Sequence, residues 1–84
     1  MSEKEARCVG YDAAVETVRL MVLTARPIIG KATGADRSST IKLLIDFATE
    51  FYYQRTSEKA QKKLRGAAGP GETGWQVLLR KAGW

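Results

Sequence analysis

The chain has 84 residues and a formal net charge of +5, with 44% hydrophobic residues, no histidine and one cysteine. A chain of this length forms one small domain at most, and its composition is that of a folded rather than a disordered protein. The lack of histidine excludes serine–histidine and cysteine–histidine catalytic pairs, and a single cysteine excludes a disulfide within the chain and a thiolate zinc site. We therefore expect a protein that is not an enzyme and that uses no metal or other cofactor.

The positive charge is concentrated in the C-terminal part of the chain. Residues 1–54 carry seven basic and seven acidic side chains, whereas residues 55–84 carry seven basic and two acidic ones. A basic patch attracts phosphate backbones, anionic membranes or acidic protein surfaces. The charged N-terminus has no signal-peptide core, and no apolar run approaches the roughly 20 residues that span a bilayer. We expect a soluble, cytoplasmic protein that does not bind membranes.

The first expected helix follows a polar segment, residues 1–10, which we expect to be flexible. Asp12 is a suitable N-cap, because its carboxylate can accept a hydrogen bond from a free amide of the first turn. Apolar residues then recur at helical spacing, at Val15, Val18, Val22 and Ala25. Pro27 is expected to end or kink this helix. A short strand over residues 17–23 is the alternative, and the period of the apolar residues favours the helix.

The second expected helix is the clearest element in the chain. Gly34 suits a left-handed turn, and Asp36, Ser38 and Ser39 are all suitable N-caps. At 100° per residue, the apolar side chains of this helix cover an arc of about 200°. They are Ile41, Leu43, Leu44, Ile45, Phe47, Ala48, Phe51 and Tyr52. Since one core needs an arc of only about 100°, the helix is either central in its own bundle or part of a dimer interface.

The chain is expected to change direction near residue 55. In a straight helix, cations beyond Gln54 would continue the apolar seam, where unpaired charges are costly. Either the helix protrudes from the core, or it breaks and restarts as a helix over residues 58–65, capped by Ser57 and ended by Gly66. A glycine-rich linker, residues 66–74, precedes a last helix over residues 74–82, which Thr73 can cap. Its apolar side consists of Trp75, Val77, Leu78 and Leu79.

Two groups of residues are candidates for binding. The first is basic: Arg55, Lys59, Lys62, Lys63 and Arg65. On a single helix the first four fall within about 100° of arc, as either a solvated face, a phosphate-binding patch or a patch for an acidic protein. The second group is Trp75 and Trp84, which either anchor a partner or fold back to cover the core.

The segment Gly34-Ala-Asp-Arg-Ser-Ser-Thr-Ile-Lys-Leu-Leu-Ile45 resembles the turn and second helix of ribbon-helix-helix DNA-binding proteins. In that family a strand from each subunit pairs with its mate and enters the major groove, and amides at the start of the second helix bind a phosphate. The resemblance implies that Thr17 and Arg19 read bases. It also implies that Arg37, Ser38 and Ser39 lie at the phosphate-binding turn.

The sequence thus predicts a mainly α fold, a small bundle of three to four helices, with an intertwined ribbon-helix-helix-like dimer as one form. Residues 1–10 form a flexible N-terminus, residues 11–66 a helical core domain ending in a basic helix, and residues 67–84 a linker and short helix. The leading function is DNA binding, as a homodimeric regulator or accessory protein of a bacterial or mobile genetic element. The alternative is a protein-interaction module, an inhibitor or adaptor that docks on an acidic partner surface.

Overall fold

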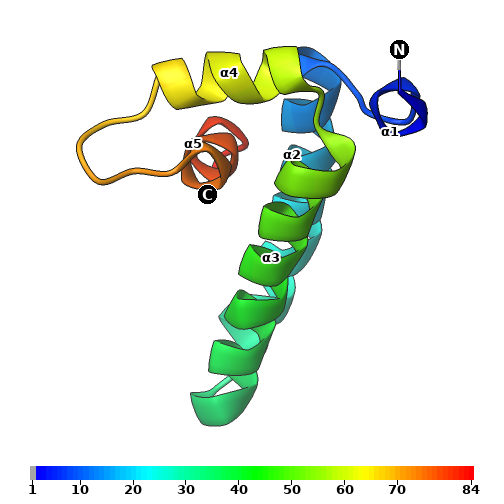
Figure 1. Ribbon diagram of the computed structural model, residues 1–84. Helices are drawn as coiled ribbons and strands as arrows, with labels where there is room; N and C mark the ends of the chain where they lie inside the picture. The colour runs from blue at the N-terminus through cyan, green and yellow to red at the C-terminus, as the bar shows by residue number, and fades with distance from the viewer. Residues whose placement is uncertain (1) are drawn as a thin grey trace.

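The computed structural model describes residues 2–84, and these residues form five α-helices (Figure 1). They are α1 (Glu3–Ala6), α2 (Tyr11–Lys31), α3 (Gly34–Arg55), α4 (Glu58–Gly66) and α5 (Gly74–Lys81). α2 and α3 lie side by side as a long antiparallel hairpin, α4 crosses one end of it, and α5 packs in the angle between them. The prediction of a mainly α fold is confirmed, and residues 2–84 contain no strand, only one isolated bridge between Val9 and Thr56.

α2 is longer than the sequence predicts. It is α-helical throughout residues 17–23, so the strand alternative is wrong. Its N-cap is Gly10 rather than Asp12, which lies in the first turn instead, where its negative charge suits the helix dipole. The helix also does not end at Pro27, which is exposed, because Ile29 just beyond it packs against the core and stabilises the last turn.

The turn between α2 and α3 contains the left-handed residue that the sequence predicts, since Gly34 has a φ of +54°. α3 nevertheless begins at Gly34, with Thr33 as its N-cap, so neither Asp36 nor the two serines that follow cap it. Arg37 explains part of the difference, because its Nε donates to the Ala32 carbonyl at the end of α2, 3.2 Å away. The tight turn therefore depends on a contact between the two helices.

The core lies where α2, α3 and α5 meet. Its fully buried side chains include Val18 and Val22 of α2, and Val77 and Leu78 of α5. From α3 it contains Leu44, Ala48 and Tyr52, which form one side of that helix. The second side of the wide apolar arc is not covered within the chain: Leu43 is 69% exposed.

The hairpin extends well beyond the core and gives the molecule an elongated shape (Figure 1). The molecule measures 45 × 29 × 18 Å and its radius of gyration is 13.5 Å. A compact domain of this length has a radius of gyration of about 12 Å. We call the end of the hairpin at the α2–α3 turn the tip, and the end at α4 the base.

The two terminal segments are both joined to this core. Residues 1–10, expected to be flexible, contain α1, and Val9 forms backbone hydrogen bonds with Arg55 and Ser57 at 2.8 and 2.9 Å. α5, expected to follow a linker as a separate short helix, contributes buried residues to the same core as α2 and α3. None of the helices in residues 2–84 combines the length and apolar character needed to cross a bilayer.

Candidate nucleic-acid interface

Hydrogen bonds from a side chain of α4 hold this helix across the end of α3. They take the place of the backbone hydrogen bonds that a continuous helix would form there. α3 ends at Arg55, and the next residue, Thr56, is extended and buried. The side-chain amide of Gln61 donates to the backbone oxygens of Tyr52 and Thr56, at 2.8 and 3.0 Å. Because the last carbonyls of a helix lack intrahelical donors, these bonds satisfy the end of α3 and fix the direction of α4.

Of the two predicted courses beyond Gln54, the structure shows the second, in which the helix breaks and restarts after Ser57. The Ser57 hydroxyl accepts a hydrogen bond from the Ala60 amide at 3.2 Å, and α4 continues to Gly66. Ala60 and Leu64 are buried, with exposed fractions of 3% and 0%. The helix is therefore anchored on one side and cannot rotate without exposing them.

Three exposed lysines lie on the remaining surface of α4, with Lys62 opposite the buried side and Lys63 beside it, and we call this surface the lysine face: Lys59, Lys62 and Lys63. At 100° per residue they fall within about 100° of arc. Among the described residues none of the three forms an ion pair. The Lys63 ammonium lies 4.1 Å from the centroid of the Tyr11 ring, a cation–π geometry that orients the side chain and leaves its charge uncompensated.

The two arginines predicted to belong to this patch are elsewhere. Because the chain breaks at Thr56, Arg55 belongs to α3 and does not share the lysine face. Arg65 lies in the last turn of α4, and its Nη1 donates to the Tyr52 hydroxyl at 3.3 Å and to the side-chain oxygen of Gln61 at 3.5 Å. The structure thus brings together three of the five predicted cations.

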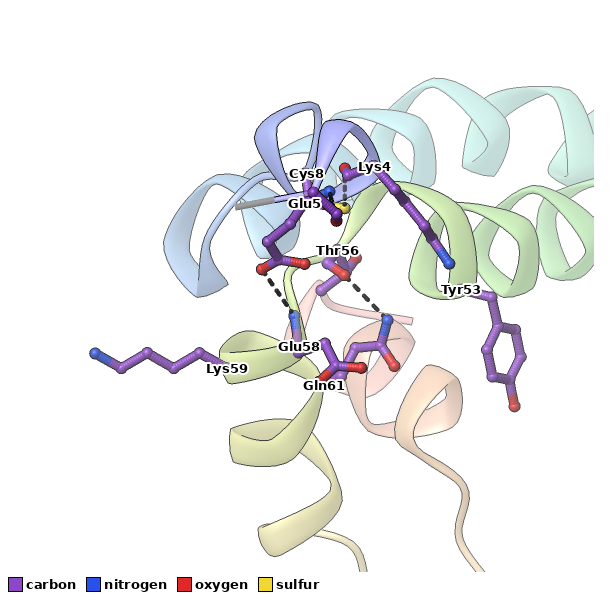
Figure 2. A pocket seen from close by; sticks show the side chains of 9 residues that line it. Lys4, Glu5, Cys8, Tyr53, Thr56, Glu58, Lys59 and Gln61 are labelled. Atoms are coloured by element: carbon purple, nitrogen blue, oxygen red, sulfur yellow. Dashed lines mark hydrogen bonds between the residues drawn. The ribbon is translucent and has the colours of Figure 1, made fainter.

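A hollow next to α4 carries charges of both signs (Figure 2). Its lining includes Glu5 and Glu58 together with Lys4 and Cys8. A Glu5 carboxylate oxygen accepts from the Glu58 amide at 3.4 Å, and the side chain of Lys59 points away from the other labelled residues. Two carboxylates oppose an anion, so this hollow is not a phosphate site. Lys59 also lines it, so the lysine face borders the hollow at this residue.

Thr17 and Arg19, implied as base readers by the family resemblance, lie on α2 and bond within the chain. The Thr17 hydroxyl donates to the Ala13 carbonyl at 2.8 Å. Arg19 Nη2 donates to the carbonyl of Lys81 at 3.3 Å, at the C-terminal end of α5. A helix C-terminus carries partial negative charge, so Arg19 fastens α5 to α2.

Arg37, Ser38 and Ser39 are at the tip of the hairpin, at the opposite end from the lysine face (Figure 1). The two serines are exposed and lie in the second turn of α3, beyond the free amides of its first turn. About 33 Å of helix, at 1.5 Å per residue, separates the two ends of α3. The two predicted phosphate contacts therefore form two distant surfaces.

Both tryptophans pack against the rest of the chain. Trp75 is half-buried and packs against the core. Trp84 is 41% exposed, and the guanidinium of Arg26 lies 5.5 Å from its ring centroid. Arg26 Nη2 also donates to the Gly83 carbonyl. These contacts fold the C-terminus back on α2. Trp75 covers the core, whereas Trp84 lies over Arg26 and remains exposed.

Two further observations concern the chemistry of the surface. Residues 2–84 contain no group of three or more histidine, cysteine, aspartate or glutamate side chains placed to hold a metal ion. The hydrogen bond from Arg80 lowers the pKa of the Glu72 carboxyl, and the same pair raises the pKa of Arg80. This pair fastens the glycine-rich linker to α5 and lies outside the lysine face.

Sequence reasoning did not single out the exposed apolar side chains of the hairpin. Leu20, Leu23, Ile28 and Leu43 are all more than half exposed. The sequence did indicate exposed apolar residues on the second helix, because its apolar arc is wider than the arc that one core requires. No protein-family model, curated protein or solved structure matches the chain.

Proposed function

We propose that this protein is a small, non-enzymatic DNA-binding protein that holds a phosphate backbone against the lysine face of α4. The observation that carries the proposal is the set of three exposed lysines on one helix whose other side is anchored, with no carboxylate paired to any of them among residues 2–84. Charges already paired inside a protein gain little from a phosphate, whereas unpaired lysines release counterions from DNA when they bind.

The chemistry of this surface favours contacts to the backbone over recognition of bases. Lysine acts as a point charge toward phosphate, and phosphate contacts carry no sequence information. Three contacts predict a slope of about −2.7 for the logarithm of affinity against the logarithm of salt concentration. Such a surface suits an accessory protein that binds many sequences with similar affinity.

The ribbon-helix-helix resemblance supports a second phosphate contact at the start of α3, where the first amides of the helix are exposed with Gly34 and Ala35. In our proposal Thr17 and Arg19 do not read bases, because both bond within the chain. We also propose that the protein acts in the cytoplasm as a homodimer, in a bacterial or mobile-element setting.

The test is a titration of the protein against labelled duplex DNA at about 50 and 200 mM salt, the range over which phosphate contacts weaken steeply. The triple variant Lys59→Ala, Lys62→Ala, Lys63→Ala should lose affinity for all sequences alike and show a flatter salt dependence. The matched control changes three other exposed lysines, Lys4, Lys31 and Lys42, to alanine and removes the same net charge. Equal effects of the two triple changes would refute the role of the lysine face.

A protein-interaction module is the second candidate, and the exposure of Trp84 and of the hairpin leucines favours it. The partner would present an acidic surface to α4 and an apolar one to the hairpin. In this case removal of Trp84 abolishes capture of the partner, and DNA binding is absent even at about 50 mM salt.

A further inference from the structure

The charged residues in the middle of the hairpin lie on one side of it or on its outer edges. Arg19 and Arg26 of α2 bond to the carbonyls of Lys81 and Gly83, so they mark the side on which α5 packs. At 100° per residue, all other charges in the middle of the hairpin lie on that side or on the outer edges. They are Asp12, Glu16, Lys42, Asp46 and Glu50.

The opposite side of the hairpin, remote from α5, is apolar, and we call it the apolar arm face. It consists of Met21, Ile28, Leu43, Phe47 and Phe51. Ile28 and Leu43 are 54% and 69% exposed, and the stacked rings of Phe47 and Phe51, 6.0 Å apart, are only half-buried. A hollow opens beside these two rings and is lined otherwise by Glu50, Gln54 and Arg55.

The threonine hydroxyls on this face already have hydrogen-bond partners. At 100° per residue, Thr17, Thr24 and Thr40 lie among the apolar side chains. The hydroxyl of each donates to the carbonyl four residues earlier in its own helix, at 2.8 Å. Burial of the face would therefore leave no threonine hydroxyl without a partner, and the usual penalty for burying polar groups does not arise.

The surface area of the chain is that of a molecule with a face still to be covered. The accessible surface is 5580 Å², whereas a compact monomer of this mass exposes about 5000 Å². A standard protein interface buries about 800 Å² of each partner. Two helices, each about 10 Å wide and about 33 Å long, present about 660 Å² on one side, which is most of that area.

Two charges at the ends of this face indicate how a second copy would be oriented. Asp36 lies near the tip and Arg55 at the base, about 28 Å apart along α3. In a parallel pair of hairpins Asp36 would meet Asp36 and Arg55 would meet Arg55, which is repulsive. In an antiparallel pair each aspartate lies opposite the arginine of the other copy, and both charges are compensated.

We propose that the apolar arm face binds the same face of a second copy of this chain, with the hairpins antiparallel, so that two hairpins form a four-helix bundle. This arrangement is self-complementary about a two-fold axis, as a closed dimer requires. It specifies the surface of the homodimer proposed above and does not rest on DNA binding. The two copies of α4 lie at opposite ends of the bundle, with their lysine faces free.

The first test is the mass of the full chain by sedimentation equilibrium over a range of concentrations. We expect twice the 9.3 kDa of one chain. Ile28→Glu and Leu43→Glu should each return the protein to a monomer, because each buries a carboxylate in the interface. Leu23→Glu, at a 58% exposed position on the outer edge toward α5, is the matched control and should stay dimeric. A wild-type mass of one chain at every concentration overturns the proposal, as does dissociation by Leu23→Glu.

The second test examines the orientation. Asp36→Arg should weaken the dimer at low salt, and the added change Arg55→Asp should restore it, since the pair is then reversed rather than lost. Lack of restoration in the double variant overturns the antiparallel arrangement. DNA binding is measured separately on the same variants: a dimer without DNA affinity refutes the function of the lysine face alone, and a DNA-binding monomer refutes the dimer alone.

Discussion

The hydroxyl of Tyr52, near the end of α3, occupies the space that a side chain at Gly74, the first residue of α5, would need. Tyr52 is 2% exposed, and its hydroxyl lies within hydrogen-bond distance of the backbone of Gln61 and of the guanidinium of Arg65. One aromatic side chain thus contacts α3, α4 and α5 at once. The close approach of α5 to α3 depends on glycine at position 74 because it has no Cβ.

The first prediction follows from this approach. Gly74→Ala should lower the free energy of unfolding by about 1–3 kcal/mol, because the new methyl group must displace the Tyr52 ring or α5. Gly66→Ala is the control: no atom lies within 4 Å of its added Cβ, and its φ is not positive. Urea denaturation followed by circular dichroism measures both variants, and similar losses in the two would contradict the account.

The second prediction concerns the corner between α3 and α4. Gln61→Met keeps the length of the side chain but removes the amide that donates to Tyr52 and Thr56. Two carbonyls at a largely buried helix end lose their donor, at a cost of about 1–3 kcal/mol. Gln61→Glu should be worse, because a carboxylate repels those carbonyls. Thermal denaturation measures both variants. If Gln61→Glu is more stable than Gln61→Met, the hydrogen bonds donated by the Gln61 amide do not stabilise this corner.

The third prediction concerns the C-terminus. Arg26→Ala removes both the bond to the Gly83 carbonyl and the cation–π contact with Trp84, so the last residues should separate from α2. In a Trp75→Phe background, fluorescence then reports Trp84 alone, and its emission should move to longer wavelength as the ring enters water. Arg26→Lys keeps the charge but not the planar group and should recover only part of the change. Unchanged emission in Arg26→Ala would show that Arg26 does not hold the ring.

The fourth prediction is a pH dependence. Hydrogen bonds from Arg80 and from the Gly69 amide hold the pKa of the Glu72 carboxyl below its ordinary value of 4.5. The ionised carboxylate therefore stabilises the folded chain above pH 4.5, and this contribution disappears as the pH falls through the lowered pKa. The difference in unfolding free energy between wild type and Glu72→Gln should be largest near neutral pH and should shrink as the pH falls below 4.5. A difference that does not change with pH would contradict the pairing.

Local interactions explain the predictions that were right. The Ser57 cap of α4 and the Thr73 cap of α5 each join residues three apart, and in α5 the Gln76 side chain completes a capping box. The break at Thr56 follows from the cations beyond Gln54, which could not continue an apolar seam. The left-handed Gly34 follows from its lack of a Cβ. The sequence determined these features because neighbouring residues suffice to specify them.

Long-range packing decided the features that the sequence did not predict correctly. α2 continues past Pro27 because Ile29 finds a core to pack against, and α3 begins early because Arg37 reaches the end of α2. Arg19 and Arg65 resemble the lysines of α4 in sequence, but each lies next to an acceptor supplied by a distant segment, whereas the three lysines have no such acceptor among the described residues. The sequence by itself determined the positions of the four longer helices, the caps of α4 and α5, and the amount of charge and apolar surface. Only the tertiary structure decided which of those side chains are free, because acceptors and covering surfaces come from elements far apart in the chain.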